Sequence, residues 1–136
     1  MPTKILALAS EPLSARVLRS ALGEEASRDA EVLVVAPALM SRARYLLAAP
    51  DPAIERAEEV QEESVERLEE EGVAAHGEAG ESDPLTAIED ALTTFDADEI
   101  VLFTHAEGSR NWAEEGLVGE AERRFSLPVR HLEVEA

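Results

Sequence analysis

The chain has 136 residues, of which 45% are hydrophobic and only 4% aromatic, so a single domain with an aliphatic core is expected. Its formal net charge is −18, and a surface this acidic repels phosphate backbones, which argues against binding to DNA or RNA. The absence of cysteine excludes disulfides, thiol catalysis and zinc–thiolate centres.

The N-terminal segment does not have the pattern of a secretory signal, because the apolar run after Lys4 extends only over residues 5–9. No stretch of the sequence approaches the roughly 20 apolar residues that a membrane span requires. We therefore expect a soluble, cytoplasmic protein with no membrane partner.

The first predicted elements are a strand, a helix and a second strand. The apolar run over residues 5–9 indicates a buried strand. Apolar residues then recur at helical spacing over residues 13–22, and Gly23 suits the end of that helix. Residues 31–36 are apolar on both faces, as in an interior parallel strand, and an irregular segment follows over residues 37–52.

A long acidic helix is predicted over residues 52–71. Its apolar stripe consists of Ile54, Ala57, Val60, Ser64, Val65 and Leu68. The many glutamates on the other faces are most simply interpreted as a solvated surface. Gly72 ends the helix, and residues 73–79 predict a weaker strand on the edge side of a sheet.

The C-terminal part continues the alternation of helices and strands. Asp83 and Pro84 suit the N-cap and the first position of a helix. Residues 99–104 form a second continuous apolar strand, and a polar loop follows it. A further helix is predicted from about Asn111 to Phe125, and residues 128–134 predict the last strand.

Strands that alternate with helices indicate right-handed crossovers and a parallel sheet with helices on both faces. The sequence therefore predicts one doubly wound α/β domain over residues 1–136, with five strands. Ligands of such folds bind beyond the carboxyl ends of the strands, where the strand order reverses. The loops expected to form a site are therefore residues 10–13, 37–45 and 105–119.

Several short motifs, in order and spacing, resemble those of the universal stress protein family. They are Gly-Glu-Ser-Asp-Pro at 80–84, Ala-Ile at 87–88, Ala-Asp-Glu-Ile-Val-Leu at 97–102 and Pro-Val at 128–129. The resemblance spans nearly the whole chain. It implies an adenine nucleotide alpha hydrolase-like fold with strand order 3-2-1-4-5 and a role in the stress response.

Members of this family that bind ATP carry an aspartate after the first strand and a G-x2-G-x9-G-[ST] loop after the fourth. Those glycines let backbone amides approach the phosphates. Here Ser10 stands at or near the aspartate position, and Thr104 and Glu107 stand at the first two glycine positions. Gly116 matches the third glycine only if one residue is deleted, and Leu117 then replaces the hydroxyl residue. We therefore expect ATP to bind weakly or not at all through this loop.

Arginines occur in two of the loops expected at the carboxyl edge of the sheet. Arg42 and Arg44 follow the second strand, and Arg110 follows the fourth. Together they would hold a phosphate or carboxylate, whereas the simpler interpretation pairs each with a nearby glutamate. The full set of candidate ligand-binding residues is Ser10, Val35, Arg42, Arg44, Thr104, His105, Gly108, Ser109, Arg110, Asn111 and Gly116.

No combination of residues predicts catalysis or a metal site. His105 follows the fourth strand, but neither a nucleophile nor an orienting partner accompanies it. The histidines at 76, 105 and 131 lack metal-ligand spacing. An enzyme is therefore the third hypothesis, behind a ligand-binding regulatory domain and a dimeric interaction protein with a vestigial pocket.

The last strand lies at a sheet edge in the implied strand order. An exposed edge offers unpaired amides and carbonyls to another chain, and family members commonly dimerise through this strand. The resemblance thus implies a homodimer with the interface Val129, Arg130, His131, Leu132, Glu133 and Val134. Arg130 and Glu133 would meet opposite charges across a twofold axis. The alternative is a monomer whose edge these two charges protect.

Overall fold

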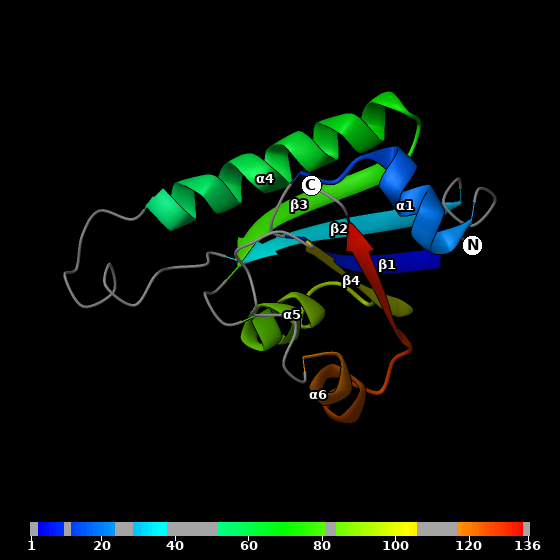
Figure 1. Ribbon diagram of the computed structural model, residues 1–136, viewed down its shortest axis with the longest axis vertical. Coiled ribbons are helices and arrows are strands. Elements are labelled where there is room, and N and C mark those ends of the chain that lie inside the picture. The colour runs from blue at the N-terminus through cyan, green and yellow to red at the C-terminus, as the bar shows by residue number, and fades with distance from the viewer. Residues whose placement is uncertain are drawn as a thin grey trace.

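The computed structural model describes residues 3–9, 12–23, 29–37, 52–80, 84–105 and 117–134. Within these ranges, one sheet is covered by helices on both faces (Figure 1). Its strands are β1 (Thr3–Ala9), β2 (Ala30–Pro37), β3 (Ala74–Gly80), β4 (Glu99–His105) and β5 (Val129–Val134). The helices are α1 (Ala15–Leu22), α4 (Pro52–Glu70), α5 (Pro84–Leu92) and α6 (Leu117–Arg124).

The sheet has the order β3-β2-β1-β4-β5, and every pair of neighbouring strands is parallel. Ile5 of the central strand β1 lies opposite Val32 of β2 and Glu99 of β4. This arrangement confirms the predicted fold class and strand order. The predicted strands agree with the observed ones to within two residues at each end.

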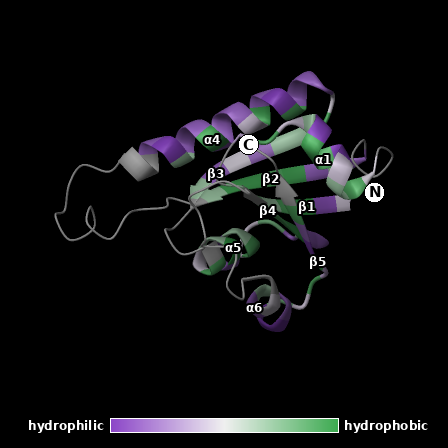
Figure 2. Cartoon of the chain, in the orientation of Figure 1, coloured by the Kyte–Doolittle hydropathy of each residue, from purple (hydrophilic) through white to green (hydrophobic). Residues whose placement is uncertain are grey.

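Two aliphatic layers separate the sheet from its helices. Because side chains alternate along a strand, Leu6 and Val35 pack beneath α5 and α6, whereas Ile5 and Val34 pack beneath α1 and α4. Residues 5–9 of β1 are at most 2% exposed, so the central strand is buried on both faces. Figure 2 shows this pattern as apolar inner strands and a hydrophilic outer face on α4.

Helix α1 begins two residues later than the sequence predicts. Ser14 is its N-cap, with the hydroxyl oxygen accepting a hydrogen bond of 3.2 Å from the amide of Val17. The helix ends at Gly23, as predicted, where a φ of 91° places the backbone in the left-handed region that favours glycine. The Gly23 amide donates to the carbonyl of Arg19 at 2.8 Å.

Helix α4 buries four residues of the predicted stripe, whereas Val65 is half-buried and the side chain of Ile54 lies outside the described part. Ala57, Val60, Ser64 and Leu68 are each at most 2% exposed. After the helix the backbone turns at Gly72, whose φ is 83°, and Val73 donates to the carbonyl of Leu68 at 2.9 Å. The long apolar stripe and this turn together fix α4 over β2 and β3.

The opposite face of the sheet is covered by α5 and α6. Helix α5 begins at Pro84, as predicted, and buries Ala87, Ile88 and Ala91. Helix α6 contributes Ala121, and Phe125 follows it directly into the same cluster. The first part of the helix predicted from Asn111 lies outside the described residues.

Candidate functional site

All five strands are parallel, so their carboxyl ends meet at one edge of the sheet. The described part of β1 ends at Ala9, which lies opposite Phe103 of β4. Strand β4 continues two residues further, to His105. On the other side of β1, Leu8 lies opposite Val35, and β2 continues to Pro37. The described ends of β1, β2 and β4 therefore lie next to one another at this edge.

The strand order reverses at the same place. From β1 the chain crosses through α1 to β2, whereas from β4 it crosses through α6 to β5 on the opposite side. The helices α1 and α6 also lie on opposite faces of the sheet (Figure 1). The connections after β1 and β4 therefore diverge, which is the geometry that opens a ligand-binding crevice in parallel α/β sheets.

Three of the predicted ligand-binding residues fall within the described strands. Val35 is 0% exposed and belongs to the cluster beneath α5, so its side chain is part of the core. Thr104 and His105 form the backbone end of β4, opposite Glu133 and Val134 of β5. The remaining predicted residues, which are Ser10, Arg42, Arg44, Gly108, Ser109, Arg110, Asn111 and Gly116, lie outside the described residues.

A buried hydrogen bond anchors the segment that follows β1. The amide of Leu13 donates to the hydroxyl oxygen of Ser64 on α4 at 2.7 Å. Ser64 is 0% exposed and Leu13 is 2% exposed, so this bond is shielded from water. The sequence places Ser64 in the apolar stripe of a helix, and nothing in that pattern indicates a partner 51 residues away. The bond ties α4 to the chain close to the carboxyl end of β1.

Many arginines in the described part of the chain pair with glutamates. Arg19 lies 3.7 Å from Glu71, and Arg124 lies 3.1 Å from Glu89. The other pairs are Arg56–Glu59, Arg67–Glu63, Arg123–Glu120 and Arg130–Glu99. These arginines follow the salt-bridge interpretation, while the three arginines of the predicted anion site lie outside the described ranges.

Over the described ranges, no group of three or more histidine, aspartate or glutamate side chains is arranged to hold a metal ion. The Nε2 atom of His76 lies 3.5 Å from a carboxylate oxygen of Glu31 on the neighbouring strand, and both groups are partly or largely exposed. None of the helices in these ranges is long and apolar enough to cross a membrane.

Strand β5 is at the sheet edge, as the strand order implies, and in the described part of the chain it pairs only with β4. Arg130 donates to Glu99 on β4 and to the carbonyl of Ala21 at the end of α1, the latter at 3.0 Å. Its guanidinium is thus engaged within its own chain. Leu132 is half-buried against the α1 side of the core.

Comparison with solved structures identifies the class of fold. A universal stress protein from Archaeoglobus fulgidus is 20% identical and aligns over 96% of this chain and 93% of its own, with a TM-score of 0.65. A universal stress protein family protein from Arabidopsis thaliana with AMP bound is 15% identical and aligns over 99% and 94%, with a TM-score of 0.66.

The Archaeoglobus fulgidus protein in complex with dAMP is 22% identical and aligns over 96% of this chain and 97% of its own, with a TM-score of 0.63. No protein-family model matches the sequence, and no curated protein matches it significantly. At these identities the similarity establishes the fold. This chain has the universal stress protein fold, as its motifs predict.

Proposed function

We propose that this protein is a ligand-binding regulatory domain that takes a nucleoside monophosphate, or another small phosphate-bearing anion, at the carboxyl edge of its sheet. The observation that carries the proposal is the reversal of the strand order between β1 and β4, where the helices α1 and α6 lie on opposite faces of the sheet. Two structures with this fold were solved with AMP or dAMP bound, which supports a nucleotide of this size.

The sequence after β4 favours a short phosphate group over a triphosphate. A triphosphate needs several backbone amides that approach it closely, and glycines supply that freedom. Thr104 and Glu107 occupy two of those glycine positions, and the carboxylate of Glu107 repels an anion. A single phosphate can instead be held bidentately by arginine, and Arg42, Arg44 and Arg110 belong to the two loops concerned.

The second candidate is an interaction protein with a vestigial pocket. The same substitutions at the glycine positions favour it, because they remove the usual nucleotide contacts. Under this alternative the fold presents surfaces to partners, and no small anion binds at the carboxyl edge. The two candidates therefore differ in a property that can be measured on the purified protein.

A thermal-shift screen separates them. A ligand that binds only the folded state stabilises it by about 2.7 kcal/mol at 100 times its Kd. We expect AMP or a phosphorylated metabolite to raise the Tm, and Mg·ATP to raise it less at equal concentration. An absence of any shift with millimolar mononucleotides and sugar phosphates contradicts the proposal and favours the vestigial pocket.

Variants then locate the site. The triple change Arg42→Ala, Arg44→Ala and Arg110→Ala is expected to abolish the shift. A control that removes the same positive charge, Arg56→Ala, Arg123→Ala and Arg124→Ala, alters only arginines that pair with glutamates on helices. It should retain the shift, and an equal loss in both variants would show that the three loop arginines form no site.

We further propose that the protein is a homodimer joined through β5. The support is the position of β5 at the sheet edge and the half-buried Leu132, whose apolar side chain a second copy would cover. Since Arg130 is engaged by Glu99 and the Ala21 carbonyl, backbone pairing and apolar contact would carry the interface instead of charge.

A further inference from the structure

The opposite edge of the sheet also offers unpaired backbone groups. In the described part of the chain β3 pairs only with β2, so the amides and carbonyls on its outer side face away from the sheet. Proteins commonly protect such edges with lysine, proline or a bulge. The sequence of β3 is Ala-Ala-His-Gly-Glu-Ala-Gly, which contains neither lysine nor proline. Within the described residues no further strand pairs with this edge, so its outer backbone groups are available to an added strand.

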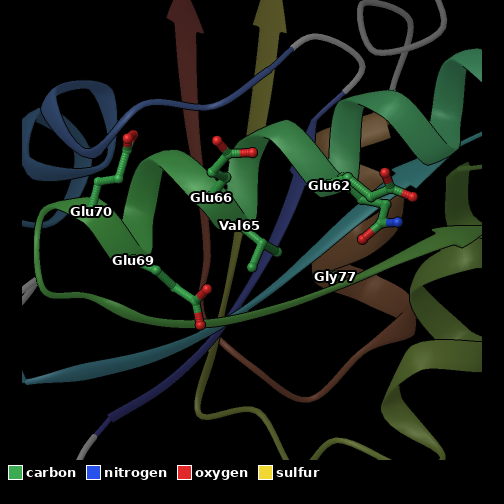
Figure 3. Close-up of a pocket in the computed structure, with 7 residues that line it drawn as sticks. Glu62, Val65, Glu66, Glu69, Glu70 and Gly77 are labelled. Carbon is green, nitrogen blue, oxygen red and sulfur yellow. The ribbon is translucent and has the colours of Figure 1, made fainter.

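An open groove of about 600 Å³ lies between α4 and this edge (Figure 3). The residues that line it are Gln61, Glu62, Val65, Glu66, Glu69, Glu70 and Gly77. Figure 3 shows Val65 and Glu69 directed toward β3, whereas Glu66 and Glu70 project from the side of α4 that faces away from β3. A Cβ atom at Gly77 would lie 2.2 Å from the Gln61 side-chain oxygen, so glycine allows α4 to pack directly on the edge strand.

Within the described ranges, the carboxylates that line this groove form no ion pairs. Arg67 pairs with Glu63, Arg56 with Glu59, and Arg19 with Glu71. These pairs involve the glutamates that surround the groove. Among the ion pairs of the described residues, none reaches Glu62, Glu66, Glu69 or Glu70. The groove beside β3 therefore contains one apolar side chain and four carboxylates that have no ion-pair partner among the described residues.

We propose that the β3 edge and this groove bind an extended segment of a partner protein that carries basic residues at alternate positions. The segment adds a strand to β3 through backbone hydrogen bonds, which is a common mode of peptide recognition. This interaction is independent of the proposed ligand site at the carboxyl edge. It follows from the open strand edge and from the charge that accompanies it.

The spacing of the glutamates along α4 supports a partner segment with basic residues at alternate positions. Glu62, Glu66 and Glu70 are each four residues apart, which is about 6 Å along a helix. Alternate side chains of an extended strand are about 6.6 Å apart. Along the helix axis the two repeats differ by about 1.2 Å over three side chains, and flexible arginine or lysine chains also have to follow a rotation of about 40° around the helix per four residues. Their aliphatic stems would cover Val65 while their charged ends reach the carboxylates.

The same charges disfavour a second copy of this chain at β3. Two copies paired along this edge would bring two sets of groove carboxylates together, on molecules that each carry a net charge of −18. The groove thus selects against self-association while it attracts a basic partner. Charge complementarity is the property that distinguishes these two occupants.

The test uses the full chain and a fluorescein-labelled peptide of four Arg-Val repeats, followed by fluorescence anisotropy at low salt. One control peptide places four arginines before four valines. The second control is a pair of peptides that keep the alternating sequence. One carries N-methyl groups on the arginine amides and the other on the valine amides, so that one of the two peptides cannot donate hydrogen bonds to β3. We expect the block peptide and one methylated peptide to bind at least about tenfold more weakly than the alternating peptide. A tenfold loss of affinity corresponds to about 1.4 kcal/mol of binding free energy.

Matched protein variants complete the test. Glu62→Gln, Glu66→Gln and Glu70→Gln together should weaken the alternating peptide at least tenfold. Asp90→Asn, Asp96→Asn and Glu122→Gln remove the same charge from exposed positions elsewhere and should change binding less than twofold. Circular dichroism checks that both variants fold. Equal binding of all the peptides, or an equal loss in both variants, would reduce the effect to general charge attraction and overturn the proposal. Loss of a dimer in the groove variant would show that a second copy occupies this edge, which also overturns it.

Discussion

Replacement of Ser64 by alanine tests how the segment after β1 is held. Ser64 is fully buried on α4, and its hydroxyl oxygen accepts a 2.7 Å hydrogen bond from the amide of Leu13. Alanine removes the acceptor and leaves a small space that is too confined to restore the bond through bulk water. The amide of Leu13 then remains buried without a partner, because Leu13 itself is only 2% exposed.

The magnitude follows from the environment of this bond. A buried donor that loses its only acceptor costs about 1–3 kcal/mol. Alanine is a better helix former than serine, and this offsets up to about 0.5 kcal/mol. We therefore expect Ser64→Ala to lower the free energy of unfolding by about 1–2 kcal/mol. For a domain of this size, a loss of 1 kcal/mol lowers the Tm by about 3–5 °C.

Urea denaturation followed by circular dichroism measures the loss, and hydrogen exchange of the Leu13 amide locates it. Ser20→Ala is the matched control, because Ser20 is exposed on α1 and its hydroxyl donates only to the carbonyl of Arg16, at 3.1 Å. The control should change stability by less than about 0.5 kcal/mol. If Ser64→Ala and Ser20→Ala have equal effects, or if Leu13 exchange is unchanged, the anchor contributes nothing.

Three further substitutions test other parts of the account. Gly77→Ala should destabilise the protein by about 1 kcal/mol in thermal melts, because the new Cβ would lie 2.9 Å from a Val65 methyl group. This overpacking outweighs the stabilisation that comes from the lower entropy of the unfolded chain, so a higher Tm would contradict the packing. Ser14→Ala should cost about 1 kcal/mol in urea denaturation by removing the N-cap of α1, and an unchanged midpoint would show that the cap is dispensable. Leu132→Pro should convert a dimer to a monomer in light scattering, whereas Ala79→Pro, on the edge strand β3 at the other end of the sheet, should not. A dimer that survives Leu132→Pro would place the interface away from β5.

The elements of this fold are readable from the sequence because each carries a local signal. Residues 31–36 and 99–104 are continuous apolar runs, and both form strands that pair on either side of β1. The stripe from Ala57 to Leu68 has helical spacing and is buried on α4. The order and spacing of the family motifs also imply the strand order, which local residue patterns alone do not specify.

The features that the sequence does not reveal depend on distant partners. The start of α1 at Ala15 follows from the capping role of Ser14 and from the Leu13 amide, which bonds to a residue 51 positions away. Arg130 contacts Glu99 and the Ala21 carbonyl, at separations of 31 and 109 residues. Apolar periodicity contains no information about such pairs.

The candidate site is predicted less completely than the fold. The sequence correctly identifies the edge at which β1, β2 and β4 end, since this follows from parallel topology. The side chain of Val35, however, belongs to the core, because it lies on the face of β2 that α5 covers. Arg42, Arg44 and Arg110 lie outside the described residues, and their local residue pattern does not determine whether they come together.

The most direct test of the proposed function is an NMR titration of the isotopically labelled protein with AMP. If a small phosphate-bearing anion binds at this edge, we expect saturable changes in the amide signals of Ala9, Thr104 and His105, at the carboxyl ends of β1 and β4. The signals of Lys4 and Asp98, which lie at the amino ends of the same two strands, should not change. No saturable change with millimolar AMP or any other mononucleotide or sugar phosphate, or changes confined to the amino edge, would contradict the claim that a small phosphate-bearing anion binds at the carboxyl edge.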